Sequence, residues 1–369
     1  MTIQVWDYRR ELEAEKDEVH AAIEKVLASG RLILGEHVRT FEERFAAYCD
    51  TRFGVGVGNG TDAIFLALKA LDVGPDDEVI TVPNTAVPTV SAIASTGAVA
   101  RFVDVDADTC LMDVSQLERA ITPRTKAILP VHLYGQCVDM DAVRRIAAAR
   151  GLKIVEDCAQ SHGALYRGTK AGGMSDAAAF SFYPTKILGG FGDGGMVVTG
   201  AEAVAQKLKR LRFYGMEKTY YSIEHGYNSR LDELHAAILL GKLAHLDDYV
   251  TRRRALARRY DAALPGLGLG LPVERPEGRH AYYLYVCRHA RRDWIIDELK
   301  KRDIVVNVSY PWPIHTMTGY TSLGYKEGDF PRAEAAAREV FSLPMYPSLT
   351  DTEQDVVIAA LKDILKAGG

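Results

Sequence analysis

Short strand-like segments alternate with helix-like segments between residues 53 and 156, and this alternation constrains the fold more than any other feature of the chain. The first cycle is a strand-like stretch at 53–58 followed by an amphipathic stretch at 61–71, and the last strand-like stretch is at 153–156. Such alternation is typical of a mostly parallel sheet covered by helices on both faces. Ligands of these sheets bind beyond the carboxyl ends of the strands. The sequence therefore predicts an α/β fold whose sites follow its strands.

The second half of the chain indicates a division into two domains. Residues 231–260 are almost free of Gly and Pro and predict one or two long helices, whereas residues 264–278 are rich in both. A chain of 369 residues also exceeds what one hydrophobic core usually organises. We expect a large domain at 1–262, which includes an N-terminal helical segment, and a smaller C-terminal α/β domain at 263–369.

Charge and hydropathy exclude several classes of partner. The 45 Lys and Arg residues and 49 Asp and Glu residues give a net charge of −4, which provides no electrostatic basis for binding nucleic acid or an anionic membrane. No run approaches the ~18 consecutive apolar residues of a membrane span, and the charged residues 1–16 lack the apolar core of a secretory signal. We expect a cytoplasmic protein with no nucleic-acid or membrane partner.

Cysteine and histidine spacing gives no sign of a metal centre. The five cysteines are far apart and form no CxxC pair, and the ten histidines form no HExxH motif. This pattern is typical of a reducing compartment and argues against thiolate or histidine metal sites. We expect no metal.

The first candidate site is the turn Gly58-Asn59-Gly60-Thr61-Asp62 between a strand and a helix. Glycines let the backbone approach a ligand closely, and the first N–H groups of a helix bind anions. The turn can therefore hold a phosphate, with an ordinary glycine-rich βα turn as the alternative.

The second candidate is Asp157, which follows the strand at 153–156. A carboxylate just past a buried strand is poorly hydrated and needs a cationic or donor partner. A protonated pyridinium nitrogen is one such partner, and a helix N-cap is the alternative role.

The third candidate is Lys186, which lies between an apolar strand at 177–182 and the glycine-rich residues 189–195. Most lysines are solvated, but burial at this place would lower the pKa of the amine, as a Schiff-base nucleophile requires. A phosphate cradle, a carboxylate and a pocket lysine at one edge of a sheet together fit pyridoxal 5′-phosphate (PLP). The sequence therefore predicts PLP as the cofactor.

These motifs make the chain resemble the DegT/DnrJ/EryC1/StrS family of sugar aminotransferases. The resemblance extends over nearly the whole chain and is carried by GNGTDA, EDCAQSHGA, SFYPTK with GDGG, and GYNSRLDELHAAIL at 226–239. It implies the PLP-dependent transferase fold type I, which is an α/β fold with a mostly parallel sheet flanked by helices and a smaller C-terminal α/β domain.

The resemblance also implies roles for residues that match its motifs. Lys186 would be the catalytic residue, forming the Schiff base and moving the proton between cofactor and sugar. Asp157 would partner the ring nitrogen, and Gln160 would contact the phenolic oxygen of the cofactor.

The cofactor phosphate would be held from two subunits. The resemblance places Gly60, Thr61 and Ser181 around it in one subunit and Asn228 of the partner subunit on its other side. This implies a homodimer with active sites at the subunit interface. For Asn228 and Arg230, a loop hydrogen-bonding pair is the alternative.

One position departs from the family pattern. Many members place a flat side chain against the cofactor ring within a segment resembling PxNTYxAT, and the matching residue here is Ala86. A methyl group cannot stack as a ring does. We expect Ala86 to lie against the ring with help from neighbouring side chains.

The reaction implied is amino transfer from L-glutamate to a nucleotide-linked keto-deoxysugar. Family dehydratases have histidine in place of the lysine, and this chain keeps Lys186. The DCAQSHG motif and residues 214–233 resemble family members that act at C-3 of a keto sugar more than those that act at C-4. This resemblance favours C-3 of a dTDP-3-keto-6-deoxyhexose over C-4 of a UDP- or GDP-linked sugar. Candidate substrate contacts are basic and aromatic residues: Tyr183, Lys218, Tyr220, Tyr221, Arg230, Tyr310 and His315.

Three other functions remain as alternatives. A non-catalytic regulatory protein could share the fold, although it has no need for Lys186, Asp157 and Gln160 together. A nicotinamide-dependent oxidoreductase is disfavoured, because the GxGxxG at 190–195 precedes a strand rather than a helix. A PLP enzyme acting on ordinary amino acids is not excluded by the sequence.

Overall fold

A seven-stranded sheet forms the centre of the protein in the computed structural model, which describes residues 2–367. Its strands are β1 (Phe53–Val57), β2 (Glu78–Thr81), β3 (Val99–Phe102), β4 (Thr125–Ile128), β5 (Lys153–Asp157), β8 (Ala177–Ser181) and β9 (Gly195–Thr199). They are ordered β1-β9-β8-β5-β4-β2-β3, and β9 alone runs antiparallel to both of its neighbours within the described residues. The expected α/β fold with a mostly parallel sheet is confirmed.

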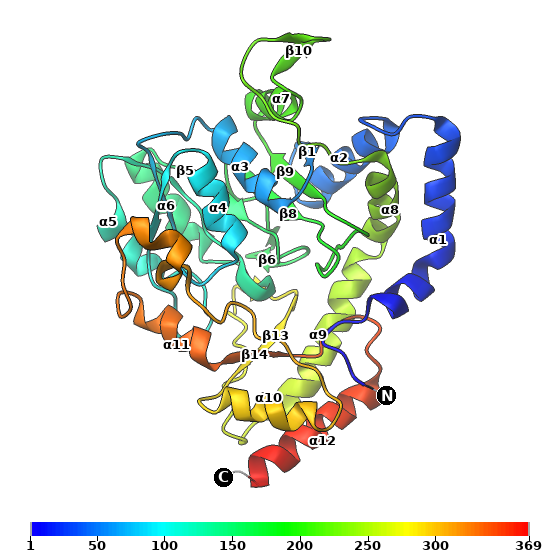
Figure 1. Ribbon diagram of the computed structural model, residues 1–369, viewed down its shortest axis with the longest axis vertical. Coiled ribbons are helices and arrows are strands. Elements are labelled where there is room, and N and C mark those ends of the chain that lie inside the picture. The colour runs from blue at the N-terminus through cyan, green and yellow to red at the C-terminus, as the bar shows by residue number, and fades with distance from the viewer. Residues whose placement is uncertain (1, 368–369) are drawn as a thin grey trace.

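Helices pack around this sheet (Figure 1). The helices of the first two thirds of the chain are α1 (Tyr8–Ser29), α2 (Glu36–Tyr48), α3 (Gly60–Ala70), α4 (Val87–Ser95), α5 (Leu117–Ala120), α6 (Met140–Arg150), α7 (Glu202–Leu211), α8 (Glu233–Ala244) and α9 (Leu246–Ala263). Gly30 ends α1 with a left-handed φ of 66°, which glycine adopts without steric cost. The long helical stretch expected at 231–260 is present as α8 and α9.

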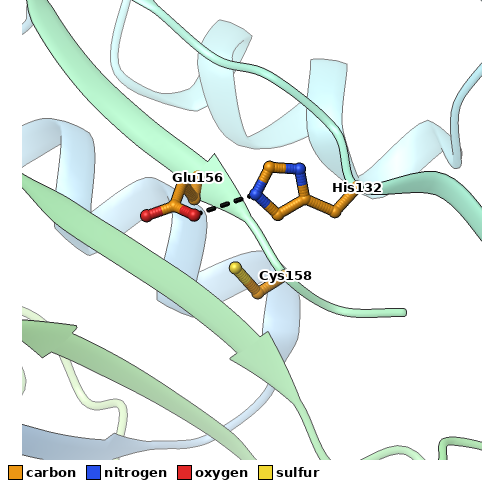
Figure 2. A group of neighbouring side chains, drawn as sticks. All are labelled: His132, Glu156 and Cys158. Carbon is orange, nitrogen blue, oxygen red and sulfur yellow. Dashed lines mark hydrogen bonds and ion pairs between the residues drawn. The ribbon is translucent and has the colours of Figure 1, made fainter. Parts of the chain in front are cut away.

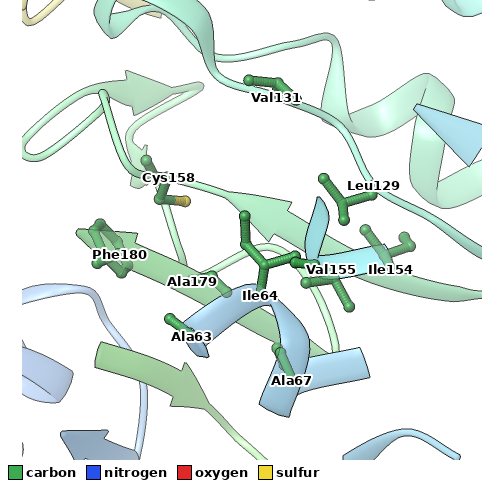
Figure 3. Close-up of a cluster of buried hydrophobic side chains, with 14 of the residues drawn as sticks. Ala63, Ile64, Ala67, Leu129, Val131, Ile154, Val155, Cys158, Ala179 and Phe180 are labelled. Atoms are coloured by element: carbon green, nitrogen blue, oxygen red, sulfur yellow. The ribbon is translucent and has the colours of Figure 1, made fainter. Parts of the chain in front are cut away.

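The helix that opens the candidate site packs directly on the sheet. Ala63, Ile64 and Ala67 on α3 face Val155 of β5 and Ala179 of β8 (Figure 3). All five residues of β8 are buried, and its run of alanines leaves room for α3 to approach closely. The burial on both faces explains why the strand reads as a continuous small and apolar run.

The structure shortens one strand relative to the sequence prediction. The pattern of residues 125–132 predicts one continuous strand, but β4 ends at Ile128 and only a single bridge joins Val131 to Asp157. Pro130 follows within three residues and has no N–H to donate to a neighbouring strand. Its carbonyl still accepts the N–H of Asp157 at 2.9 Å, so this segment continues to support the end of β5.

The C-terminal third contains the remaining helices and a small sheet. These elements are α10 (Arg292–Lys300), α11 (Pro331–Glu339), α12 (Asp351–Ala367), and the antiparallel pair β13 (Tyr285–Arg288) and β14 (Val340–Leu343). A second hydrophobic cluster joins Tyr285, Leu299 and Leu361 to Ile3 and to Leu256 of α9. The domain division at 262/263 stays a prediction.

Two further small sheets lie outside the central one. One joins β12 (Gly278–Arg279), β6 (Leu165–Tyr166) and β7 (Thr169–Lys170). The other is a hairpin of β10 (Met216–Lys218) and β11 (Tyr221–Ser222), which projects from the top of the molecule in Figure 1. None of the helices within residues 2–367 is both long and apolar enough to cross a membrane.

Candidate active site

A cavity of about 360 Å³ lies where the carboxyl ends of β5 and β8 meet the start of α3. The predicted site residues that line it are Gly60, Thr61, Ala86, Asp157, Gln160, Ser181, Tyr183 and Lys186. These residues come from segments more than 120 positions apart, and the parallel sheet brings them to one edge.

One end of the cavity is built as an anion cradle. Asn59 caps α3 by accepting the N–H of Asp62 at 2.8 Å, and the earlier amides of Gly60 and Thr61 have no partner within the helix. A Cβ on Gly60 would stand 2.6 Å from Cβ of Ser181, so only glycine lets the helix start lie against this serine. The amides of Gly60 and Thr61 and the hydroxyls of Thr61 and Ser181 can therefore donate hydrogen bonds to a phosphate.

Asp157 lies on another part of the cavity wall. It closes β5 and is 5% exposed, and its Oδ2 accepts a hydrogen bond from the hydroxyl of Thr89 at 2.9 Å. Burial raises the pKa of Asp157, and hydrogen bonds from the Ala159 amide and Thr89 and the charge of Lys186 only partly oppose it. A cation placed beside this carboxylate would therefore stabilise its charged form.

Lys186 follows β8 on a tight loop. A Cβ on Gly189 would lie 2.3 Å from the carbonyl oxygen of Pro184, so the loop closes only with glycine at that position. Nζ of Lys186 lies 4.7 Å from the centre of the Tyr283 ring, and the Tyr283 hydroxyl is 3.1 Å from that of Thr185. The amine thus rests on an aromatic face rather than on a carboxylate.

Gln160 is held in one orientation by two tyrosines. Its Oε1 accepts the backbone N–H of Tyr134 at 2.8 Å, and its Nε2 donates to the hydroxyl of Tyr310 at 2.5 Å. The two tyrosine rings stack with centroids 6.4 Å apart. The amide N–H₂ of Gln160 thus donates to Tyr310, and its contact with the phenolic oxygen of the cofactor stays a prediction.

Two predicted substrate residues in the YPWPIH stretch have different settings. Tyr310 adjoins the cavity through Gln160. His315 is 2% exposed, and its Nε2 lies 2.9 Å from Glu334 under the ring of Phe330. His315 is buried in this arrangement, and its role as a substrate contact stays a prediction. The neighbouring Ile314 amide donates to the Pro83 carbonyl, which ties this segment to the stretch that contains Ala86.

The remaining predicted residues do not line the cavity of their own chain. Lys218, Tyr220 and Tyr221 are exposed on the projecting hairpin, where Tyr220 is 92% exposed. Asn228 is exposed, and the guanidinium of Arg230 lies over the ring of Phe213 at 5.2 Å. Their roles stay predictions.

A buried group behind Asp157 has the side chains of a metal site but is already hydrogen-bonded. His132, Glu156 and Cys158 lie together at the end of β5 (Figure 2), and His132 Nε2 is 2.8 Å from Glu156. Nδ1 of His132 accepts the N–H of Val138, which places the ring proton on Nε2. Glu156 also accepts hydrogen bonds from the 172–175 loop. Together with His132, these hydrogen bonds outweigh the effect of burial and lower the pKa of Glu156. We therefore interpret the group as structural.

Sequence reasoning missed several residues that line the cavity. These are Thr85, Thr89, Thr185, Asp193 and Tyr283. Thr89 lies three residues after Ala86, which was predicted to contact the cofactor ring, so its polar side chain close to that position was the available signal. Tyr283 carries no such signal, because only the tertiary fold brings residue 283 beside Lys186.

The model of the DegT/DnrJ/EryC1/StrS aminotransferase family matches residues 13–362. The chain belongs to this family. The predicted family is thus confirmed, and with it the assignment to aminotransferases.

Individual members share the whole length of the chain. A dTDP-3-amino-3,4,6-trideoxy-α-D-glucose transaminase of Micromonospora megalomicea subsp. nigra is 55% identical over 99% of both chains. The structure of S. venezuelae DesV, solved in complex with a ketimine intermediate, has a TM-score of 0.97 at 46% identity over 99% of both chains. NtdA of Bacillus subtilis, solved with bound cofactor PMP, has a TM-score of 0.90 at 32% identity, covering 96% of this chain and 82% of NtdA.

Proposed function

We propose that this aminotransferase uses PLP to transfer the amino group of L-glutamate to C-3 of a dTDP-linked 3-keto-6-deoxyhexose. The observation that carries the proposal is the placement of Lys186 and Asp157 on the walls of one cavity that also contains an anion cradle. The relative that is 55% identical is named as a transaminase of a dTDP-3-amino sugar, which supports C-3 and dTDP. Amination at C-4 of a UDP- or GDP-linked sugar is the alternative.

The residues present fit PLP on observations of the cavity itself. The cradle of Gly60, Thr61 and Ser181 suits the phosphate. Asp157 is a buried carboxylate with a raised pKa and lacks a cationic partner within 4.0 Å among residues 2–367, and it suits a protonated ring nitrogen. Ala86, Pro88 and Val131 supply an apolar wall beside them, which supports the expectation that small side chains together cover the ring.

When bound, PLP supplies an aldehyde that accepts an amino group and a protonated ring that accepts the electron pair of the carbon–hydrogen bond being broken. Asp157, with the Thr89 hydroxyl fixing one oxygen, holds the proton on the ring nitrogen. Gln160 donates to an oxygen acceptor from a position set by the Tyr134 amide. Lys186 Nζ is the amine that takes a proton from the donor carbon and returns one to the sugar carbon.

Two features of the cavity leave Lys186 as the group placed for this proton transfer. Tyr283 lies beneath Lys186 Nζ and limits the space into which the amine can rotate. Glu156, the other carboxylate near the end of β5, is 0% exposed and directed away from the cavity by strand alternation. Among the cavity-lining residues, Lys186 therefore remains the amine placed for acid–base work.

We further propose that a homodimer completes the site. The hairpin of β10 and β11 presents Tyr220 and Tyr221 to solvent, 92% and 62% exposed, beside Lys218. Two adjacent exposed tyrosines on a projecting hairpin are suited to insertion into a neighbouring molecule, where they can stack on a nucleotide base. Asn228 and Arg230 continue from the same hairpin and would contribute polar contacts to the partner's cavity.

The test is a pair of half-reactions followed by product analysis. Purified protein loaded with PLP is mixed with L-glutamate, and formation of 2-oxoglutarate is measured. A dTDP-3-keto-6-deoxyhexose is then added, and the position of the new amine is determined by NMR. Amine at C-3 supports the proposal, amine at C-4 supports the alternative, and release of 2-oxoglutarate without any aminated sugar contradicts the sugar acceptor.

A further inference from the structure

A second chamber lies on the other side of the catalytic lysine segment. Its volume is about 210 Å³, and Lys186, Ile187 and Gly189 form one wall. The other walls come from α1, which packs beside α8 (Figure 1), from α9, and from the residues after β14. The polar residues that line it are Glu11, Glu15, Lys242, Tyr249, Arg253 and Ser348.

Two buried donors that line this chamber have no partner in the part of the chain that the structure describes. Arg253 is 2% exposed, and its Nη1 donates to the carbonyl oxygens of Tyr282, Tyr283 and Met345, but its Nε has no acceptor. Oγ of Ser348 is likewise buried without a partner. Buried donors are almost always hydrogen-bonded, so two such atoms on one chamber indicate an oxygen-bearing occupant.

The charges around the chamber are divided between two walls. Glu15 is neutralised by Lys242 Nζ at 2.6 Å and by the hydroxyl of Tyr249. Glu11 forms no ion pair within 4.0 Å among residues 2–367, although it is hydrogen-bonded to the side chain of Trp6. Burial raises the pKa of Glu11 against the opposing charges of Arg253 and Lys242 and the hydrogen bond with Trp6. Arg253 likewise has no carboxylate at ion-pair distance in that range. One guanidinium and one carboxylate thus face the same space without contacting each other.

We propose that this chamber binds a free α-amino acid, with its carboxylate on Arg253 and Ser348 and its ammonium on Glu11. Separated opposite charges complement a zwitterion, whereas a simple anion would meet Glu11 and a simple cation would meet Arg253. The volume is roughly seven times that of one water in the liquid, which accommodates a small amino acid. In naming the amino donor, L-glutamate, as the occupant, the inference rests on the proposed function.

The location connects this occupant with the catalytic residue. Lys186 lines both the chamber and the substrate cavity. Arg253 donates to the carbonyl of Tyr283, whose ring supports Lys186 Nζ. An amino acid bound to Arg253 would therefore stabilise the position of Tyr283, and through it that of Lys186, from the side of the chamber.

Calorimetric titration of the borohydride-reduced holoenzyme tests this chamber. Reduction fixes the cofactor on Lys186, so added amino acids bind without reacting. L-Glutamate and L-alanine are expected to bind saturably, and 2-oxoglutarate and acetate, which lack the ammonium group, about tenfold more weakly or not at all.

Variants assign the binding to the chamber rather than to the substrate cavity. Glu11→Gln keeps the shape but removes the charge and is expected to weaken L-glutamate binding about tenfold; Ser348→Ala is expected to weaken it several-fold, by roughly the effect of one hydrogen bond. Glu13→Gln is the matched control, because Glu13 lies on the same helix with its side chain 76% exposed. It should leave the affinity unchanged.

Two results would overturn the inference. One is the absence of saturable L-glutamate binding to the reduced protein, and the other is binding that Glu11→Gln and Ser348→Ala both leave intact. Failure of the proposed function is seen separately, as the absence of 2-oxoglutarate when the unreduced holoenzyme is mixed with L-glutamate.

Discussion

The hydroxyl of Thr89 donates to Oδ2 of Asp157 at 2.9 Å, so the start of α4 orients the carboxylate that ends β5. The same hydroxyl oxygen lies 2.9 Å from that of Thr85. Because the single proton of Thr89 is used on Asp157, Thr85 is the donor in this second bond. A chain of two threonines thus fixes one oxygen of the carboxylate within a fully buried layer.

Thr89→Val is expected to weaken PLP binding by about tenfold or more, since a hydrogen bond to a charged group is worth about 1.5–3 kcal/mol. The valine keeps the branched shape and removes only the hydroxyl. The dissociation constant is measured by absorbance titration of the apoprotein. Thr85→Val is the matched control and should have a smaller effect, because Thr85 reaches the carboxylate only through Thr89. Equal losses in both variants would contradict the direct role of Thr89.

Lys186→Ala is expected to lower the turnover number by ~10³-fold or more while the protein remains folded, since the variant loses the only amine on the cavity wall among the described residues. Turnover is measured with glutamate and the dTDP-keto sugar, and folding by circular dichroism. Borohydride treatment and peptide mapping should show a pyridoxyl group on Lys186 in the wild type. A label on another lysine would contradict the assignment.

Mixed dimers test whether Asn228 acts on the partner's site. Lys186→Ala and Asn228→Ala chains, inactive or weakened alone, are co-expressed with different tags and purified as a mixture. Random pairing yields mixed dimers with one intact site each, and activity should recover to about a quarter of the wild-type value. If Asn228 acts within its own chain, no mixed dimer contains an intact site and activity stays at the level of the separate variants.

His162 predicts a specific acid sensitivity. Burial among Phe45, Phe180 and Phe182 lowers the pKa of its ring to about 3, and neither ring nitrogen has a hydrogen-bond partner in the described residues. Below pH ~6.5 the His162 ring of the unfolded chain becomes protonated, whereas the ring in the folded protein stays neutral. The contribution of His162 to the free energy of unfolding is therefore fully present above that pH and is lost as the pH falls toward 3.

His162→Leu should therefore reduce the loss of unfolding free energy between pH 7 and pH 4.5 by about 2–3 kcal/mol, since one proton contributes ~1.4 kcal/mol per pH unit. Urea unfolding of the apoprotein at the two pH values measures this. The exposed His20→Leu is the control, because that ring is in contact with water when the protein is folded. An unchanged pH dependence in His162→Leu would show that His162 takes up its proton in the folded protein as well.

The sequence by itself determined the sheet, the family and the residues at the ends of its strands. Strand and helix periodicities are local properties, so the alternation from residue 53 onward predicted the fold without knowledge of strand order. Gly60, Asp157 and Lys186 were found for the same reason, because each lies at or shortly after the carboxyl end of a strand within a short motif. The order β1-β9-β8-β5-β4-β2-β3 and the antiparallel direction of β9 depend on long-range pairing and were not predicted.

Only the tertiary structure decided which distant side chains meet these residues. The hydroxyl of Thr89 reaches Asp157 and the ring of Tyr283 supports Lys186 across 68 and 97 positions of sequence, and no local pattern encodes such contacts. His315 matched a motif in the sequence, yet the structure buries it against Glu334, because burial depends on the elements packed around a residue. Sequence fixes what each segment prefers to form, whereas packing of the whole chain fixes which polar groups face a common space.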